Sequence, residues 1–117
     1  MIRQTALTAV AVLALSMPAL NAAAQTFSVK KYDIGGEGST DYLTAEAGSG
    51  RVFVARQTHV MVVDANTGAV IGDIPNTPRV HGIGLAPKSN HGFTTNGGDS
   101  SVTMFDLKTL AFIKKIP

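Results

Sequence analysis

One pattern of residues occurs twice in this chain of 117 residues, and it limits the possible folds more than any other feature. The run Val60-Met-Val-Val-Asp64 returns as Val102-Thr-Met-Phe-Asp106, and Ile74-Pro75 returns at the same spacing as Ile116-Pro117. A repeat of this length indicates a structural unit that buries its apolar faces against neighbouring copies of itself.

Before these runs, equivalent positions of the two copies are expected to be one residue closer together in the sequence, so that Val52 corresponds to Phe93 and Ala45 to Ala86. The second copy is therefore expected to carry one extra residue in the loop Gly97-Gly98-Asp99. Each unit contains four short apolar runs, which at a period of roughly 42 residues is typical of a four-stranded β-propeller blade. The expected strands are 42–46, 51–55, 59–64 and 69–74 in blade one (42–75), and 82–86, 92–96, 101–106 and 110–116 in blade two (82–117).

A third, partial copy precedes these two units. Residues 26–34 end in Tyr32-Asp-Ile34. This run precedes Tyr42 by the same number of residues as Gly72-Asp-Ile74 precedes Gly82. This predicts a single outer strand that acts as a clasp, since many closed propellers assemble one blade from both ends of the chain. A full ring would need roughly 170 to 340 residues, so we expect an all-β fragment of a larger propeller.

The leading segment, 1–24, has the composition of a bacterial signal peptide. Arg3 is followed by an uncharged apolar run from Ala6 to Met17, and Ala22-Ala-Ala24 supplies small residues for cleavage before Gln25. The run is too short for a comfortable membrane span. We therefore expect a periplasmic or secreted protein, with residues 25–117 as the mature partial propeller and no membrane association after cleavage.

Several stretches resemble a known family of secreted bacterial proteins. Arg51-Val-Phe-Val-Ala, Val62-Val-Asp-Ala-Asn-Thr-Gly and His81-Gly-Ile-Gly-Leu-Ala-Pro are similar to the YVTN-type repeats of YncE-like β-propeller proteins. The resemblance covers residues 27–117. It implies a seven-bladed, periplasmic propeller, of which this chain would be an N-terminal part, and it implies no particular reaction.

The candidate site residues lie in loops that are expected to open on one face of the blades. Strands of a blade alternate in direction, so the loop that enters the first strand and the loop between the second and third strands share a face. A ligand-binding set is therefore predicted from these two kinds of loop. It consists of Asp41, Arg79, His81, Asn96 and Asp99.

Each of these residues also has a structural interpretation. His81 is the best candidate for a ligand or proton-handling group, although its ring could instead bond the backbone of a neighbouring blade. The stretch from Asn96 to Asp99 fits a tight hairpin as well as a site for an anion or metal. Asp64 and Asp106 recur once per unit, so we expect them to accept hydrogen bonds from the amides of the following turns.

The residue types argue against several chemistries. The chain has no Cys and no Gly-x-Ser-x-Gly elbow, and its three His residues are spread over both blades, with His91 expected on the opposite face. No metal site or cofactor is therefore predicted. Without the leader, nine Lys and Arg face eight Asp and Glu, a balance that does not indicate a nucleic-acid partner.

These observations favour a non-enzymatic scaffold that binds a small ligand or a protein. The first alternative is a metal-dependent hydrolase of the propeller lactonase type, to which Asp41, Glu37 and Asn96 could contribute part of a calcium site. The second is weak binding of single-stranded DNA, which needs stacking aromatic residues that the loop face lacks. The bare flanks of the blades predict that the mature chain self-associates or needs further blades.

Overall fold

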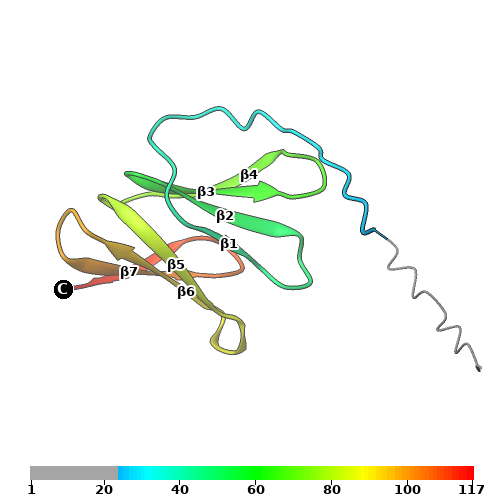
Figure 1. Ribbon diagram of the computed structural model, residues 1–117. Coiled ribbons are helices and arrows are strands. Elements are labelled where there is room, and N and C mark those ends of the chain that lie inside the picture. The colour runs from blue at the N-terminus through cyan, green and yellow to red at the C-terminus, as the bar shows by residue number, and fades with distance from the viewer. Residues whose placement is uncertain (1–23) are drawn as a thin grey trace, which may run out of the picture.

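The computed structural model describes residues 24–117, which form two antiparallel β-sheets and no α-helix (Figure 1). The first sheet contains four strands in the order β1-β2-β3-β4, and the second sheet contains four in the order β5-β6-β7-β8. The predicted signal peptide lies almost entirely outside the described residues. The strands are β1 (Leu43–Ala45), β2 (Arg51–Arg56), β3 (His59–Asp64), β4 (Val70–Ile74), β5 (Val80–Ala86), β6 (His91–Asn96), β7 (Ser101–Asp106) and β8 (Phe112–Ile116), with a 3-10 turn η1 (Pro87–Ser89) before β6.

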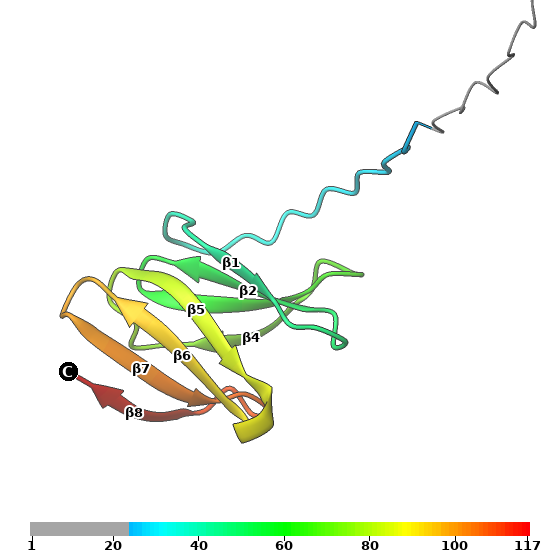
Figure 2. The same ribbon diagram turned by 60° about the horizontal axis from the view of Figure 1, so that its bottom comes forward.

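The two repeat units correspond to the two sheets. Each sheet is a meander in which every strand pairs with its neighbour in sequence, and Figure 2 shows β5, β6, β7 and β8 side by side in this order. The prediction of two four-stranded, blade-like units is therefore confirmed, with small differences at the strand ends. The strand β8, for example, begins at Phe112 rather than Leu110, which has a left-handed backbone (φ 64°).

Two equivalent aspartates close the turns that follow the third strands, as predicted. Asp64 Oδ1 accepts hydrogen bonds from the amides of Asn66 (2.8 Å) and Thr67 (3.0 Å). Asp106 Oδ1 accepts them from Lys108 (2.9 Å) and Thr109 (2.7 Å). These backbone donors are the main cause of the lowered pKa of both carboxyl groups.

The core of the described residues lies between the two sheets. Phe53, Val60 and Val62 of the first sheet are fully buried and pack with Ile83 and Phe105 of the second. The rings of Phe53 and Phe105 have centroids 6.1 Å apart. Burial of one such side chain contributes about 1.5–3 kcal/mol, so this apolar contact is the main force that holds the sheets together.

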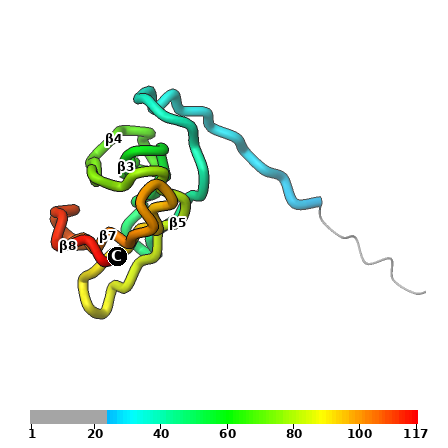
Figure 3. Tube along the Cα trace, turned by 90° about the vertical axis from the view of Figure 1, so that its left-hand side faces the viewer, coloured from blue at the N-terminus to red at the C-terminus, as the bar shows by residue number. Residues whose placement is uncertain are grey.

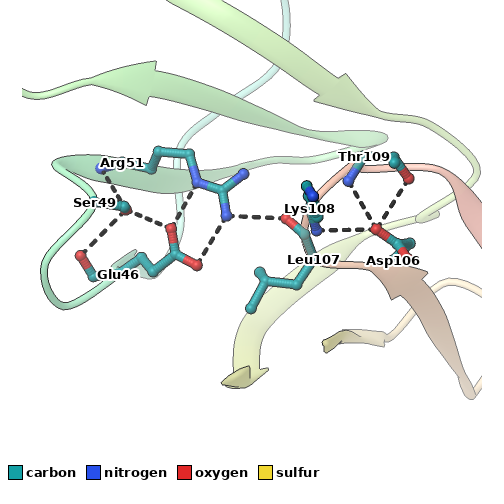
Figure 4. A network of polar contacts seen from close by, with 7 residues as sticks. All are labelled: Glu46, Ser49, Arg51, Asp106, Leu107, Lys108 and Thr109. Carbon is teal, nitrogen blue, oxygen red and sulfur yellow. Dashed lines mark hydrogen bonds and ion pairs between the residues drawn. The ribbon is translucent and has the colours of Figure 1, made fainter. Parts of the chain in front are cut away.

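Arg51 adds a polar connection between the sheets (Figure 4). Its Nε lies 2.6 Å from Oε2 of Glu46, and its Nη2 donates both to Oε1 of Glu46 (2.8 Å) and to the carbonyl oxygen of Leu107 in the second sheet (2.9 Å). At the first strands, Thr44 Oγ1 donates to the carbonyl oxygen of Ile83 (2.7 Å). The relative position of the two sheets is thus set by directional bonds as well as by apolar packing.

The register of the second sheet differs from the predicted one. The loop between β2 and β3 consists of Gln57 and Thr58 alone, whereas the loop between β6 and β7 spans 97–100. The last hairpin pairs, Arg56 with His59 and Asn96 with Ser101, therefore correspond. The loop of the second copy is thus two residues longer. The distance in sequence between equivalent positions of the two copies is therefore two residues shorter before this loop than after it.

The prediction assumed a single extra loop residue. The predicted distance between equivalent positions before this loop is consequently wrong by one residue. In a strand a shift of one residue exchanges the two faces of the sheet. Phe93 therefore corresponds to Phe53, whose side chain points toward the neighbouring sheet, and not to Val52. The second extra loop residue accounts for the difference.

The predicted clasp strand over residues 26–34 is not formed. Phe27 and Val29 are each 80% exposed, and the beginning of this segment, blue in Figure 3, extends away from both sheets. A strand requires a neighbour that completes its backbone hydrogen bonds. Within residues 24–117 no strand pairs with this segment, so its backbone remains irregular.

The end of this segment nevertheless takes the position that the partial repeat implies. Ile34 packs on Val54, Met61 and Val63, on the face of the first sheet that points away from the second sheet. Arg56 holds the following residues by donating to the carbonyl oxygens of Gly35 (3.1 Å), Gly36 (2.9 Å) and Gly38 (3.0 Å). We call residues 32–38 the N-terminal strap.

The strap contacts the first sheet as β4 contacts the second. Tyr32 lies over Gly68, and Leu110 lies over Gly72, so closely that a Cβ on either glycine would clash. With the corrected spacings, Tyr32 is the counterpart of Gly72 and Gly68 is the counterpart of Leu110. The same contact is therefore made twice, with the large and small residues exchanged.

Among the described residues, no helix has the length and apolar character needed to cross a membrane.

Candidate functional site

A cavity of about 200 Å³ lies at the loop face, where the entry loops of the two sheets meet. Three of the five predicted site residues line it, namely Asp41, Arg79 and His81. The remaining lining residues are Ser39, Thr40, Gln57 and Val80. The cavity therefore combines residues from both repeat units, and the contact between the sheets creates it.

The two sheets are joined across this cavity by His81 and Asp41. His81 Nδ1 lies 2.5 Å from Oδ2 of Asp41, and the side chains are 47% and 40% exposed. Because a carboxylate only accepts hydrogen bonds, the proton of this contact belongs to Nδ1. In the neutral imidazole, Nε2 then carries the lone pair, and the ring is held in one orientation. The alternative in which His81 bonds a neighbouring backbone is not what the structure contains.

The backbone around the cavity is held in an uncommon conformation. Gln57 (φ 61°) and Arg79 (φ 48°) are both left-handed, although neither is glycine. They are held in place by the hydrogen bond from the Val80 amide to the Gln57 carbonyl oxygen (2.9 Å). Such conformations cost of order 1–3 kcal/mol each and often occur at binding sites.

The glycines of the β6–β7 loop pack against the same region. The amides of Gly97 and Gly98 donate to the carbonyl oxygens of Arg79 (2.9 Å) and Pro78 (3.0 Å). A Cβ on Gly97 would lie 2.8 Å from His81 Nε2, so a side chain there would disturb the imidazole. The prediction that these two loops share one face is confirmed.

Asn96 does not reach this cavity, because its amide is part of a buried network. It is 3% exposed, accepts a hydrogen bond from Thr94 Oγ1 (2.8 Å), and donates to Ser101 Oγ (3.1 Å) and Thr103 Oγ1 (2.9 Å). Both polar atoms of its side chain therefore have partners within the sheet. The register turns its side chain toward the first sheet, so Asn96 is not among the residues that line the cavity, and its amide is engaged by neighbouring hydroxyl groups.

Asp99 is likewise engaged outside the cavity. Its carboxylate accepts from Ser101 Oγ (2.5 Å) and pairs with Lys115 Nζ (2.6 Å). The hydrogen bond from Lys115 is the main cause of its lowered pKa. The structural interpretation of the stretch from Asn96 to Asp99 as a hairpin therefore describes both residues better than the binding interpretation does.

Ser39 and Thr40 line the cavity but were missed in the sequence analysis. At the corrected spacing their counterparts are Arg79 and Val80, so the hydroxyl side chains are not repeated in the second unit, and hydroxyl residues before a strand are common. Their position directly before Asp41, at the entry to β1, was the available signal. Together with Gln57 they supply the neutral hydrogen-bonding groups of the cavity.

The described residues do not assemble a metal centre. They contain no group of three or more His, Cys, Asp or Glu side chains placed to hold an ion. Of the residues considered for a calcium site, Asp41 lines the cavity, Glu37 does not, and the Asn96 amide is used by its neighbours. His59 lies 3.7 Å from Asp73, and His91 packs edge-on against Phe93.

A second hollow of about 370 Å³ lies at the other end of the strands. It is lined in part by Glu46, Arg51 and Asn90, and Figure 4 shows the ion pair at its wall. Arg51 is bound by Glu46 and the Leu107 carbonyl oxygen, while Asn90 donates to Asp106 (2.7 Å). Arg51 is therefore engaged in the contact between the sheets and Asn90 in a bond within the second unit, and we do not assign a ligand to this hollow.

Comparisons with known proteins support the fold and give no function. No protein-family model matches this chain, and no curated protein matches it. A solved structure titled Kuenenia stuttgartiensis Hydrazine Synthase matches with a TM-score of 0.62 and 18% sequence identity, over 77% of this chain. The match spans 26% of that chain. At this identity the similarity concerns the arrangement of the strands alone.

Proposed function

We propose that this chain is part of a β-propeller and acts as a non-enzymatic binding module, related to the YncE-like proteins whose repeats it resembles. The support comes from two consecutive four-stranded meanders that pack on each other, with the Phe53 face of the first sheet against the opposite, Phe105 face of the second, and from a strap that makes the contacts of a preceding outer strand. Seven blades remain an expectation based on the resemblance alone.

The proposed ligand is a small anion that carries a carboxylate or phosphate group. The observation that carries this proposal is the contact between His81 and Asp41 beside Arg79 in a cavity of about 200 Å³. Among the described residues Asp41 is paired with His81, whereas Arg79 makes no ion pair. An unpaired guanidinium next to hydroxyl and amide groups is suited to bind a carboxylate or phosphate in a bidentate manner.

Each neighbouring group has a defined part in this proposal. Asp41 fixes the orientation of His81, so that the imidazole does not need to be ordered when a ligand arrives. The left-handed backbone of Gln57 and Arg79 fixes the two loop ends from which their side chains project. Ser39 and Thr40 add hydroxyl donors at the cavity wall. The binding energy would then come from one charge-assisted pair and several neutral hydrogen bonds.

The test is a calorimetric titration of the mature chain with inorganic phosphate and with acetate. Arg79→Gln is expected to weaken the binding of either anion about tenfold or more, as the loss of a charge-assisted hydrogen bond implies. Lys88→Gln is the matched control, since it removes an exposed cation away from the cavity. Equal affinities of both variants, or no heat with any anion, would reject this site.

The hydrolase alternative is tested separately with calcium. A titration that gives heat at micromolar metal, and loses it in Asp41→Ala, would favour a lactonase-type enzyme over a binding module. The absence of such a signal together with anion binding would favour the module. Single-stranded DNA remains the weaker alternative, because the residues that line the cavity include no Phe, Tyr or Trp on which a base could stack.

We also propose export from the bacterial cytoplasm, on the basis of the leader-like residues 1–24. Mass determination of the protein recovered from a periplasmic extract provides the test. A mature N-terminus at Gln25 is expected. Recovery of the uncleaved chain in the cytoplasmic fraction would contradict this expectation.

A further inference from the structure

The imidazole of His81 has one nitrogen that no other group of the described chain uses. Its Nδ1 is bound to the Asp41 carboxylate at 2.5 Å, whereas Nε2 has no hydrogen-bond partner within residues 24–117. The His81 side chain is 47% exposed and lines the cavity together with Arg79. Nε2 is therefore available to a proton or to a ligand that enters from solvent.

Gly97 keeps this nitrogen uncovered. Its φ is not positive, so the backbone conformation at this position does not require glycine. The atoms nearest to a Cβ at position 97 would be Nε2 (2.8 Å) and Cδ2 (3.1 Å) of His81. A side chain at position 97 would thus press on the free edge of the imidazole. The close approach of the two residues is the physical reason for a glycine here.

Protonation of His81 changes the charge of the cavity without rearranging it. The ring already donates from Nδ1 to Asp41, so a proton added at Nε2 leaves this hydrogen bond in place. Histidine side chains change charge between about pH 5 and pH 8. The charged groups that line the cavity are Asp41, Arg79 and His81. Their total charge therefore rises from zero, with Arg79 positive and Asp41 negative, to one positive charge when the ring is protonated.

The other loops beside the ring add no unpaired charge within residues 24–117. Gln57, from the β2–β3 loop, is neutral, and the β6–β7 loop places Gly97 next to the ring. Asp99 of the same loop is paired with Lys115 at 2.6 Å, so these two charges compensate each other. Between neutral and mildly acidic pH, the charge of the cavity is therefore set by the protonation state of His81.

We propose that the cavity binds a tetrahedral oxyanion with two negative charges, and that His81 takes up one proton from solvent when the anion binds. This inference rests on the proposed function, because it uses the same cavity and the same guanidinium of Arg79. The imidazolium adds a second charge-assisted donor, Nε2–H, to the donors of Arg79. No covalent bond of the ligand changes. His81 is then the residue that favours a dianion over a monoanion.

Binding of the anion and protonation of His81 must favour each other. A ligand that prefers the imidazolium form increases the proton affinity of the ring by the same factor, because linkage between two binding events is reciprocal. We therefore expect the affinity for a dianion to increase about tenfold between about pH 8 and about pH 5.5. A monoanion gains less, since Arg79 alone already balances its charge.

The test is a calorimetric titration of the mature chain with sulfate, which remains a dianion, and with methanesulfonate, which remains a monoanion of similar shape. Sulfate should bind about tenfold more tightly at about pH 5.5 than at about pH 8, and methanesulfonate should change by less than about threefold. Titrations in two buffers with different heats of ionisation give the number of protons taken up.

A second comparison identifies the source of the oxyanion. Glycerol phosphate and inorganic phosphate are both mainly dianions at about pH 7.5. Tighter binding of glycerol phosphate would assign a phosphate ester as the ligand, and equal binding would assign the free ion.

Two variants test the part that the ring plays. His81→Gln should give a sulfate affinity that no longer changes with pH. His59→Gln is the matched control, because His59 lies 3.7 Å from Asp73 and does not line the cavity. Gly97→Ala, which places a methyl group against Nε2, should reduce the increase at low pH, whereas Gly84→Ala should not, because a Cβ there meets no atom within 4 Å.

A sulfate affinity of the natural chain that does not depend on pH would overturn this inference, and so would sulfate binding without proton uptake. Persistence of the pH dependence in His81→Gln would do the same. All three results are compatible with an anion site at Arg79, which is tested separately by the comparison of Arg79→Gln with Lys88→Gln. The absence of binding for every anion at either pH would overturn both proposals.

Discussion

Leu110 of the second sheet lies directly over Gly72 of the first sheet, and the space that a Cβ at position 72 would need is filled by the Leu110 side chain. The same contact recurs between Tyr32 and Gly68 with the sizes reversed. Two interfaces that differ in sequence thus follow one geometry. This equivalence supports the view that the strap stands in for an outer strand, and it leads to a first prediction.

Gly72→Ala is expected to lower the free energy of unfolding by roughly 1–3 kcal/mol, because the added methyl group overpacks the contact between the sheets. Chemical denaturation monitored by circular dichroism measures this change. Gly84→Ala is the matched control, since a Cβ at that strand position meets no atom within 4 Å. If Leu110→Ala does not reduce the cost of Gly72→Ala in the double variant, the clash is not its cause.

Asn96→Ala is expected to destabilise the protein by roughly 1–3 kcal/mol, because it leaves the buried hydroxyl groups of Thr94, Ser101 and Thr103 without this partner. Anion affinity at the cavity should remain unchanged in the folded fraction. Asn66→Ala, at an exposed turn, serves as the control in the same denaturation experiment. A loss of anion binding without a loss of stability would restore Asn96 to the site.

The stability of the protein is expected to fall below about pH 5. The hydrogen bond from Arg51 lowers the pKa of Glu46 from its ordinary value of 4.5. A carboxyl group whose pKa is lowered by folding stabilises the protein fully above its unfolded pKa, and this contribution is lost as the pH falls through the folded value. Asp64, Asp99 and Asp106 act in the same direction.

Thermal melts between pH 7 and pH 3 test this pH dependence. Glu46→Gln should lower the melting temperature at pH 7 and make the decrease toward pH 3 shallower. Glu37→Gln, at an exposed carboxylate that makes no ion pair within residues 24–117, should leave the profile as it is. An unchanged slope in Glu46→Gln would show that the pair with Arg51 does not carry the effect.

Arg56→Gln is expected to loosen the strap, because it removes three hydrogen bonds to the carbonyl oxygens of Gly35, Gly36 and Gly38. Met61, which is 5% exposed beneath the strap, should then be oxidised faster by hydrogen peroxide. Mass spectrometry of tryptic peptides gives the rate for each methionine. An increase of at least severalfold is expected for Met61.

Met104 provides the internal reference for this measurement, because it is half-buried on the second sheet and does not contact the strap. Its oxidation rate should be the same in the natural chain and in Arg56→Gln. A parallel rise for both methionines would indicate general unfolding. No rise for Met61 would mean that the apolar contacts of Ile34 and Tyr32 hold the strap without Arg56.

The sequence alone determined the number, order and pairing of the strands within each of the two repeat units, since each unit carries its own apolar runs and turn residues. The repeated Asp64 and Asp106 were correctly assigned to turns because their partners lie in the turns that directly follow them. It also placed Asp41, Arg79 and His81 together at one face, because alternating strand directions bring those loops to the same end.

Only the tertiary structure decided which way the side chains of β6 point, because the length of one hairpin loop sets the register and a shift of one exchanges both faces of a sheet. That choice turned Asn96 into a buried structural residue and placed Phe93 on the face of the second sheet that points away from the first. Residues 26–34 form no strand, since within the described part of the chain no other strand pairs with them to complete their hydrogen bonds. Local patterns encode the units, whereas contacts between distant segments decide their faces and edges.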